Sequence, residues 1–181
     1  MSKTNSKNIG NNYEREFSYI LSEWITGEKG ADICWRDVSS GSRYSKRKVD
    51  GKETARKADI VCTVLEYSWF FLRFYIDTKS YKEFNWCWIN KKNRKSNAVL
   101  NQWKKTVNEC PKDMIPMMPV KIRDHKTPEM IFLPKTVYID PCIPYIFISM
   151  NDQYSCYLVL LSDFLAGEKA EKFYEKNKIF K

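Results

Sequence analysis

Three stretches of this chain place an aspartate and a lysine two positions apart, a spacing that can serve metal-dependent hydrolysis. They are Asp50–Lys52, Asp77–Lys79 and Asp124–Lys126. With 22 acidic residues and 23 lysines in 181 positions, chance alone gives roughly three acid-x-Lys triplets, so their number carries no information. Only Asp77–Lys79 ends a long apolar run, "WFFLRFYID", whereas the other two lie in charged loops. The second triplet is therefore the one whose position suits a site.

Asp77 and Lys79 face the same spot if they lie on a strand, because residues two apart point to one side. Asp59, at the start of the preceding apolar run, offers a second carboxylate. Phosphodiester hydrolysis uses such a set: carboxylates hold a hard cation such as Mg²⁺, and a lysine orients the attacking water or relieves developing charge. The alternative is structural, with both aspartates at strand ends and Lys79 as an ion-pair partner.

The first element that positions these residues is a helix from Asn11 or Asn12 to about Ile25. Either asparagine can cap its start, and Gly27 offers a left-handed stop. Apolar residues recur along it at helical spacing. These are Tyr13, Phe17, Ile20, Leu21 and Trp24.

The next elements are three strands. "ADICWRDV" predicts a short strand, and the polar stretch after it, which includes the basic segment 43–57, predicts a mobile loop. The runs 58–66 and 69–77 are rich in β-branched and aromatic residues and are separated at Tyr67 and Ser68. They predict a hairpin whose second strand is central in the sheet.

A second helix is predicted over Ala98–Asn108, with Asn97 as its cap and Pro111 beyond its end. "MMPVKI", "EMIFL", "PYIFISM" and "YSCYLVLL" predict further strands, and Ser162 can cap a last helix through "DFLAGEKAEKFYEKN". This alternation predicts an α/β fold with a central mixed β-sheet flanked by helices.

Length and composition bound the class of protein. A chain of 181 residues with 43% hydrophobic content fits one domain, residues 1–181, with a flexible tail over 1–10. No stretch has the roughly 20 apolar residues of a membrane span, so we expect a soluble, cytoplasmic protein. The single histidine, His125, lies in a charged stretch and makes histidine-based catalysis a poor candidate. Six scattered cysteines without a C-x-x-C pair argue against structural zinc.

A net charge of +9 indicates a polyanionic partner, because clustered cations gain affinity for phosphates by releasing counterions. Residues 43–57 carry seven basic and two acidic side chains, and residues 91–105 carry six basic and none acidic. One such cluster is equally well explained as a solvated loop. Two clusters on either side of the candidate site in sequence favour nucleic acid.

The order of these motifs resembles a known family. Asp59 followed by "DTK" is similar to the bipartite motif of the PD-(D/E)xK nucleases, with Ala58 where proline is usual. "GNNYEREF", "RDVSSGSRYSKRK", "ADIV" and "IDTKS" resemble, in that order, the motifs of archaeal-type Holliday-junction resolvases. The resemblance covers roughly residues 10–105. It implies a restriction-endonuclease-like fold.

The resemblance also implies roles. Glu14 is then the acid of the first helix, Asp59 and Asp77 bind the metal with it, and Lys79 is the catalytic lysine. Ser40 and Ser42 approach the scissile phosphate. Glu16 competes with Glu14 for the helix role. Gln102 occupies a helix in which related nucleases often place a glutamine, but we interpret it as an exposed helical residue.

The expected function is Mg²⁺-dependent cleavage of DNA, with Mn²⁺ as a substitute metal, by a homodimeric Holliday-junction resolvase acting on branched or four-way DNA. Two alternatives stay open: a restriction, repair or mobile-element nuclease of the same fold, and a basic nucleic-acid-binding protein without catalysis. The expected DNA contacts come from the two basic clusters. They are Arg43, Lys46, Arg47, Lys48, Lys91, Lys92, Arg94 and Lys95.

Overall fold

The computed structural model describes residues 6–36, 58–83, 97–123 and 126–178. Within these ranges the chain forms an α/β fold with a mixed sheet of six strands, a separate two-stranded sheet and five α-helices. The predicted α/β class and central mixed sheet are confirmed at this level.

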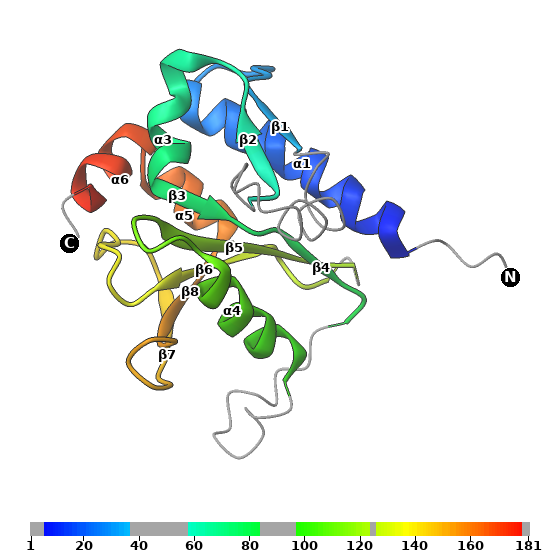
Figure 1. Cartoon of the computed structure of the whole chain (residues 1–181), viewed down its shortest axis with the longest axis vertical. Helices are drawn as coiled ribbons and strands as arrows, with labels where there is room; N and C mark the ends of the chain where they lie inside the picture. The colour runs from blue at the N-terminus through cyan, green and yellow to red at the C-terminus, as the bar shows by residue number, and fades with distance from the viewer. Residues whose placement is uncertain (1–5, 37–57, 84–96, 124–125, 179–181) are drawn as a thin grey trace, which may run out of the picture.

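The elements follow one another along the chain as labelled in Figure 1. The helices are α1 (Ser6–Thr26), the 3-10 helix η1 (Leu65–Tyr67), α3 (Ser68–Arg73), α4 (Ala98–Glu109), α5 (Leu161–Gly167) and α6 (Ala170–Asn177). The strands are β1 (Cys34–Arg36), β2 (Ile60–Cys62), β3 (Phe74–Ile76), β4 (Lys79–Tyr81), β5 (Ile115–Ile122), β6 (Met130–Pro134), β7 (Tyr145–Ile148) and β8 (Cys156–Leu160).

The six-stranded sheet is covered by helices on both faces (Figure 1). Alternate residues of β6 show this, because Ile131 and Leu133 join a core with α1, α3, α5 and α6, while Met130 and Phe132 join a second core with α4. A strand buried on both faces has no polar alternation. The continuous apolar runs in the second half of the chain therefore reflect a three-layer arrangement.

The two predicted helices before and after the triplet are present, but α1 begins at Ser6. The predicted cap at Asn11 or Asn12 is therefore wrong, and so is the predicted tail for residues 6–10, which are helical. α1 ends where Gly27 takes a positive φ of 71°, the left-handed stop expected of glycine. α4 begins at the predicted cap, since the side-chain oxygen of Asn97 accepts hydrogen bonds from the N–H groups of Val99 and Leu100, each at 3.0 Å. Each helix presents an apolar face to one side of the sheet.

The predicted hairpin over 58–77 is wrong. β2 pairs antiparallel with β1, and the segment expected to begin the second strand is instead helix α3. Its run "SWFFLR" buries Phe70 and Phe71 and leaves Leu72 half exposed. A short run that is apolar on nearly every side has no period that separates helix from strand.

The strand that carries the triplet is also not central among the described strands. β3 and β4 both pair parallel with β5, and β3 ends the order β3-β5-β6-β8-β7. A parallel neighbour requires a crossover, which α4 supplies. β2 reaches β3 through a backbone hydrogen bond of 2.9 Å from Asp59 N–H to the carbonyl of Ile76, and this bond places the two acid-bearing segments side by side.

β3 and β4 are one strand with a two-residue interruption at Asp77 and Thr78. Ile76 pairs with Met117 and Lys79 with Val120, so the register is the same on both sides. In a parallel ladder continued from the 3.0 Å bond between Asp77 N–H and Met117 O, residue 119 donates to the carbonyl of Asp77. That residue is Pro119, which has no N–H. Proline in β5 thus explains why the ladder stops at the triplet.

The predicted last helix is two helices. α5 and α6 are separated at Glu168 and Lys169, both of which have extended backbone angles. Ser162 lies inside α5 and is not its cap. Gly167 packs so closely that a Cβ would lie 2.6 Å from Cγ1 of Ile143, so the glycine at the break serves close packing.

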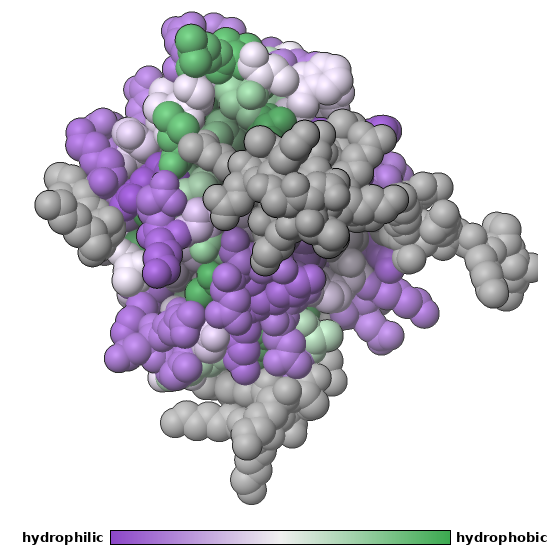
Figure 2. All heavy atoms as spheres, viewed as in Figure 1, coloured by the Kyte–Doolittle hydropathy of each residue, from purple (hydrophilic) through white to green (hydrophobic). Residues whose placement is uncertain are grey.

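The surface in the described ranges mixes hydrophilic and hydrophobic areas (Figure 2). Hydrophobic residues gather at the top of this view, over the segment from β2 to α3, in which Val64, Leu65 and Leu72 are exposed. None of the helices in the described ranges is long and apolar enough to cross a membrane.

Candidate active site

The interruption between β3 and β4 holds three residues of the predicted site together. The ammonium group of Lys79 contacts Oδ1 of Asp77, lies 3.0 Å from the carbonyl oxygen of Thr78, and lies 3.6 Å from Oδ2 of Asp59. Two of the three oxygens come from the interruption itself, and the third comes from Asp59, directly before β2. Asp59, Asp77 and Lys79 therefore converge as the sequence predicted.

Asp77 is fixed from the other side by α4. Its Oδ2 accepts a hydrogen bond of 3.2 Å from Gln102 Nε2 and a second from the hydroxyl of Thr106. Gln102 and Thr106 are four residues apart, and such residues lie on the same face of a helix. With Lys79 on Oδ1, both oxygens of this buried carboxylate are engaged.

Asp59 is oriented by the backbone of the triplet. Its Oδ2 accepts hydrogen bonds from the N–H of Thr78 at 2.9 Å and from the hydroxyl of Thr78 at 3.4 Å. Burial raises the pKa of Asp59 to about 7, the nearby charge of Asp77 adds to the rise, and Lys79 opposes it. This carboxyl group changes its charge near neutral pH.

The other two groups stay charged. Burial favours the neutral form of Asp77, but Lys79 and the hydrogen bond from Thr106 outweigh it and lower the pKa of this carboxyl. Burial also disfavours the ammonium of Lys79, yet the charges of Asp77 and Asp59 raise its pKa. At pH 7 the centre of the site is thus an ammonium–carboxylate pair beside a carboxyl group that is part protonated.

Glu14 approaches this centre from α1. Its Oε2 is paired with Nε of Arg36 on β1, and its charge contributes to the pKa shifts of both Asp59 and Lys79. Its competitor Glu16 points elsewhere and pairs with Lys121 on β5. Of the two glutamates, Glu14 is the one whose charge raises the pKa values of Asp59 and Lys79.

The residues present suit a hard divalent cation. Among the described residues, no three His, Cys, Asp or Glu side chains form a ready metal cluster. The oxygens around the Lys79 ammonium, however, are two carboxylate oxygens and a backbone carbonyl, which are ligands that Mg²⁺ accepts. The Lys79 ammonium, a cation of charge +1, already lies among these oxygens. Asp59, Asp77 and the Thr78 carbonyl would hold a metal in its place if Lys79 moved aside.

Two residues that touch the triplet were not assigned to it from the sequence. Gln102 was interpreted as an exposed helical glutamine, and this is wrong, because it is partly buried and bonds Asp77. Thr106 is fully buried and gave no signal by itself. The family resemblance was a signal for Gln102. Thr106 lies four residues further along the same helix, a spacing that puts both side chains on one face.

The remaining predicted residues lie outside the described residues. They are Ser40, Ser42, Arg43, Lys46, Arg47, Lys48, Lys91, Lys92, Arg94 and Lys95. His125 also falls outside them. Their roles stay predictions.

Replacing Asp59 by asparagine is expected to change how stability depends on pH. The pKa of Asp59 is about 7 in the folded protein against 3.8 for the ordinary carboxyl, so between these values the folded state holds a proton that the unfolded state releases. The free energy of unfolding therefore falls as pH rises through this window. Asp59→Asn removes this fall, and at pH 8 the variant gains on the order of 3 kcal/mol relative to the parent.

The measurement is urea unfolding of the metal-free protein, with chelator present, at several values between pH 5 and pH 8.5. Asp152→Asn is the matched control, because Asp152 is also paired with a lysine but is fully exposed. Parallel pH profiles for the parent and Asp59→Asn would show that Asp59 is ionised throughout. Added Mg²⁺ should stabilise the parent more at pH 8 than at pH 6, since binding needs the charged carboxylate.

Comparison of the chain with protein-family models, with curated proteins and with solved structures found no match. A function for this site is therefore inferred from its own residues.

Proposed function

We propose that this chain is a Mg²⁺-dependent endodeoxyribonuclease, a hydrolase of the PD-(D/E)xK type. One observation carries the proposal: the Lys79 ammonium lies among oxygens of Asp77, Asp59 and the Thr78 carbonyl. A lysine between two carboxylates is not distinctive alone, because Lys121 also has two such partners. At Lys79 one carboxylate is buried, the other is partly buried with its pKa raised to about 7, and a backbone carbonyl oxygen completes a set of ligands suited to a divalent cation.

The order of elements supports a restriction-endonuclease-like fold. Helix α1 carries Glu14, β2 begins just after Asp59, and β3 and β4 flank Asp77 with Lys79 at the start of β4. Helix α4 then crosses over to β5, which is parallel to the strand with the triplet. This is the order in which the resolvase-like motifs follow one another in the sequence.

Each residue of the site would have a separate role in hydrolysis. A bound Mg²⁺ would supply an activated water and neutralise charge on the phosphate. Asp77 and Asp59 would hold the cation, with Gln102 and Thr106 fixing the orientation of Asp77. Lys79, released from the three oxygens, would donate to the attacking water or to the phosphate oxygen on which charge develops.

The charge of the molecule supports a nucleic-acid substrate. The net charge is +9, and the end of the second basic cluster, Lys104 and Lys105, lies on α4, the helix that also carries Gln102 and Thr106. Hydrophilic residues gather over the part of Figure 2 in which α4 lies. A basic surface on this helix would attract the phosphates of a nucleic acid.

The proposed substrate is branched DNA, and a four-way junction in particular, cut by a homodimer. A junction with two-fold symmetry needs two equivalent cuts, which a symmetric pair of sites provides. The resolvase-like motifs support this choice over a restriction, repair or mobile-element nuclease with the same chemistry.

The test is incubation of the purified protein with labelled four-way, splayed and linear duplex DNA of matched length, in Mg²⁺, Mn²⁺ or chelator. We expect cleavage with either metal, none with chelator, and paired cuts in the four-way junction at a rate well above that of the duplex. The preference should survive a salt titration, although the affinity for every DNA falls.

Two other results would lead to different conclusions about the function. Equal cleavage of all three DNAs would favour the general nuclease. Binding of DNA without cleavage in either metal would contradict the proposal and favour a basic nucleic-acid-binding protein.

A further inference from the structure

Two of the cysteines lie directly opposite each other in the two-stranded sheet. β1 pairs antiparallel with β2, and in the register of this pair Cys34 faces Cys62. No other two cysteines among the described residues are partners in a strand pair. The two residues lie on either side of the segment 37–57 in the sequence, and neither thiol takes part in the hydrolytic chemistry proposed above.

The hydrogen-bond pattern brings these two cysteines as close as neighbouring strands allow. Thr63 N–H donates to the carbonyl of Ile33 at 2.9 Å, so Ile33 and Thr63 form a hydrogen-bonded pair. Such pairs alternate with non-hydrogen-bonded pairs along an antiparallel ladder, and the next pair, Cys34 with Cys62, is therefore non-hydrogen-bonded. The N–H of Cys34 accordingly donates to the hydroxyl of Ser22 on α1, at 2.9 Å.

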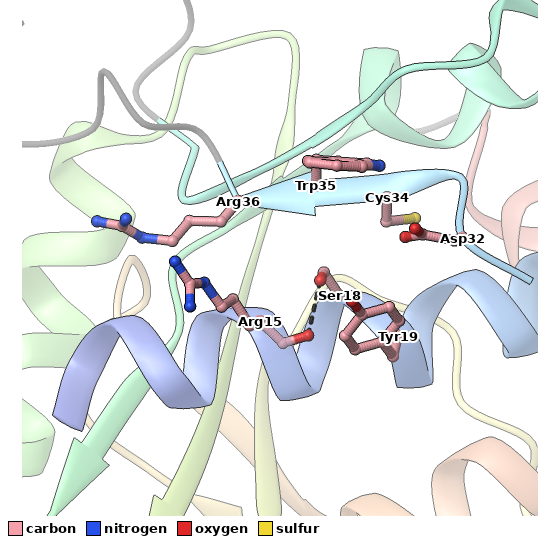
Figure 3. A pocket seen from close by; sticks show the side chains of 7 residues that line it. All are labelled: Arg15, Ser18, Tyr19, Asp32, Cys34, Trp35 and Arg36. Atoms are coloured by element: carbon pink, nitrogen blue, oxygen red, sulfur yellow. Dashed lines mark hydrogen bonds between the residues drawn. The ribbon is translucent and has the colours of Figure 1, made fainter. Parts of the chain in front are cut away.

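The spacing of a non-hydrogen-bonded pair suits a disulfide. Its Cα atoms lie about 4.5 Å apart, and disulfides join Cα atoms that are roughly 4.4–6.8 Å apart. Directly opposite residues also point to the same side of a sheet. Cys62 packs against the core that contains Cys34, and Figure 3 shows Cys34 on the side of β1 that faces α1, with Trp35 on the other side. A bond between the two sulfurs thus needs rotation of side chains and little movement of the backbone.

The two thiols differ in how accessible they are. Cys62 is partly exposed, and its Sγ donates to the carbonyl of Val64 at 3.0 Å, so a reagent in solution can reach it. Cys34 is buried and is one of the residues that line a pocket of about 160 Å³ between α1 and β1 (Figure 3). A reagent therefore meets Cys62 first, and Cys34 is the second thiol, which closes the bond.

We infer that Cys34 and Cys62 form a site of reversible oxidation, at which the reagent is a low-molecular-weight disulfide such as oxidised glutathione. The Cys62 thiolate attacks one sulfur of the reagent and releases the first thiol. Cys34 then attacks the Cys62 sulfur, releases the second thiol and completes the bridge. The protein loses two protons and two electrons, and the reagent is reduced to two thiols.

The bridge would hold together a short element beside the candidate site. β1 and β2 share only three residue pairs, and two paired strands are marginally stable by themselves. β1 ends with Arg36, the partner of Glu14, and β2 begins directly after Asp59. Oxidation thus fixes the two strands that bring these residues to the candidate site, and it closes a loop that contains the first basic cluster. The inference goes beyond the proposed function and does not rest on it.

The experiment incubates the native protein with mixtures of reduced and oxidised glutathione at pH 8.5, because burial raises the pKa of both thiols and only thiolates exchange. The remaining thiols are then blocked, trypsin cuts after lysine and arginine, and non-reducing mass spectrometry maps the bond. We expect the tryptic peptides 30–36 and 58–73 to be linked, with a mass about 2 Da below the sum of the two reduced peptides. Dithiothreitol should separate them.

Variants test whether the bond joins these two cysteines. Cys62→Ser and Cys34→Ser should each abolish the linked peptides, whereas Cys142→Ser, which replaces an exposed cysteine, should leave them unchanged. The oxidised parent should resist urea more than the reduced parent, because a cross-link restricts the unfolded chain. Cys62→Ser should show no such difference between oxidising and reducing conditions.

Three results would overturn the inference. They are glutathione that stays attached to Cys62 without a bond to Cys34, a first bond between other cysteines, and a bond between Cys34 and Cys62 that forms equally well in concentrated urea, where the strand register is lost. The mapping needs neither DNA nor metal, so it is independent of the proposed nuclease. A mapped bond in a protein that does not cleave DNA would support the oxidation site and contradict the nuclease, and cleavage without a mapped bond would do the reverse.

Discussion

Replacing Lys79 by alanine is expected to lower the rate of DNA cleavage by roughly 10³-fold or more, the scale of losing a charge-stabilising donor, while DNA binding largely persists. The ammonium faces inward, toward Asp77 and Asp59, and the basic clusters are expected to provide most phosphate contacts. Without it, two carboxylates face each other in a buried site. The metal-free variant should therefore lose on the order of 3 kcal/mol of stability.

The same substitution should tighten the binding of Mg²⁺ or Mn²⁺ to the free protein, because Lys79 no longer competes for the three oxygens. Calorimetry and unfolding with and without metal measure this. Lys121→Ala is a matched control: Lys121 also pairs with two carboxylates, and its side chain is 28% exposed against 26% for Lys79. If Lys79→Ala loses DNA binding in step with cleavage, or binds metal more weakly, Lys79 is an anchor and not a catalytic residue.

Asp77→Asn is expected to abolish cleavage, again by roughly 10³-fold or more, in a protein that still folds. An amide has the shape of the carboxylate, and its nitrogen can take the place of Oδ2. The Thr106 hydroxyl can then donate to the backbone carbonyl of Gln102, 3.0 Å away, and accept a hydrogen bond from the new amide nitrogen. The Gln102 side chain can also reverse its amide. The substitution therefore removes charge from the site with little damage to packing.

Excess Mg²⁺ should not restore the Asp77→Asn variant if the carboxylate is a direct ligand. The measurement is the cleavage rate over a wide Mg²⁺ titration, with circular dichroism to verify the fold. Asp152→Asn, which removes a fully exposed aspartate paired with Lys135, should keep the parental rate. Recovery of the rate at high Mg²⁺ would place Asp77 outside the set of metal ligands.

Much of the fold could be predicted wherever one residue type fixes the local geometry. Gly27 and Asn97 marked helix ends because positive φ and helix capping have strong residue preferences. The segment 69–73 could not be assigned, because its apolar residues cover nearly all sides. The pairing of β3 and β4 with β5 was also beyond the sequence, since their parallel partner begins only at Ile115, after the crossover through α4.

The residues of the site likewise fall into those that the sequence could predict and those that it could not. Asp59, Asp77 and Lys79 could be selected because the triplet follows an apolar run, and residues two apart share a side of a strand. Gln102 and Thr106 depend on how α4 packs against the triplet, which no local pattern reports. The pair Glu14–Arg36 joins α1 to β1 across 22 positions, and its existence follows only from the tertiary fold.

Pro119 leaves the sheet without one backbone hydrogen bond, next to the residues of the candidate site. Any other amino acid there would bring an N–H opposite the carbonyl of Asp77 and allow one uninterrupted strand to form. Such a change would strengthen the sheet and, by drawing Asp77 and Thr78 into regular pleating, disturb the turn of backbone that presents their oxygens. The sheet thus lacks a hydrogen bond beside the residues of the candidate site. Under the proposed function, a substitution of Pro119 should raise stability and lower activity, as stabilising changes near active sites often do.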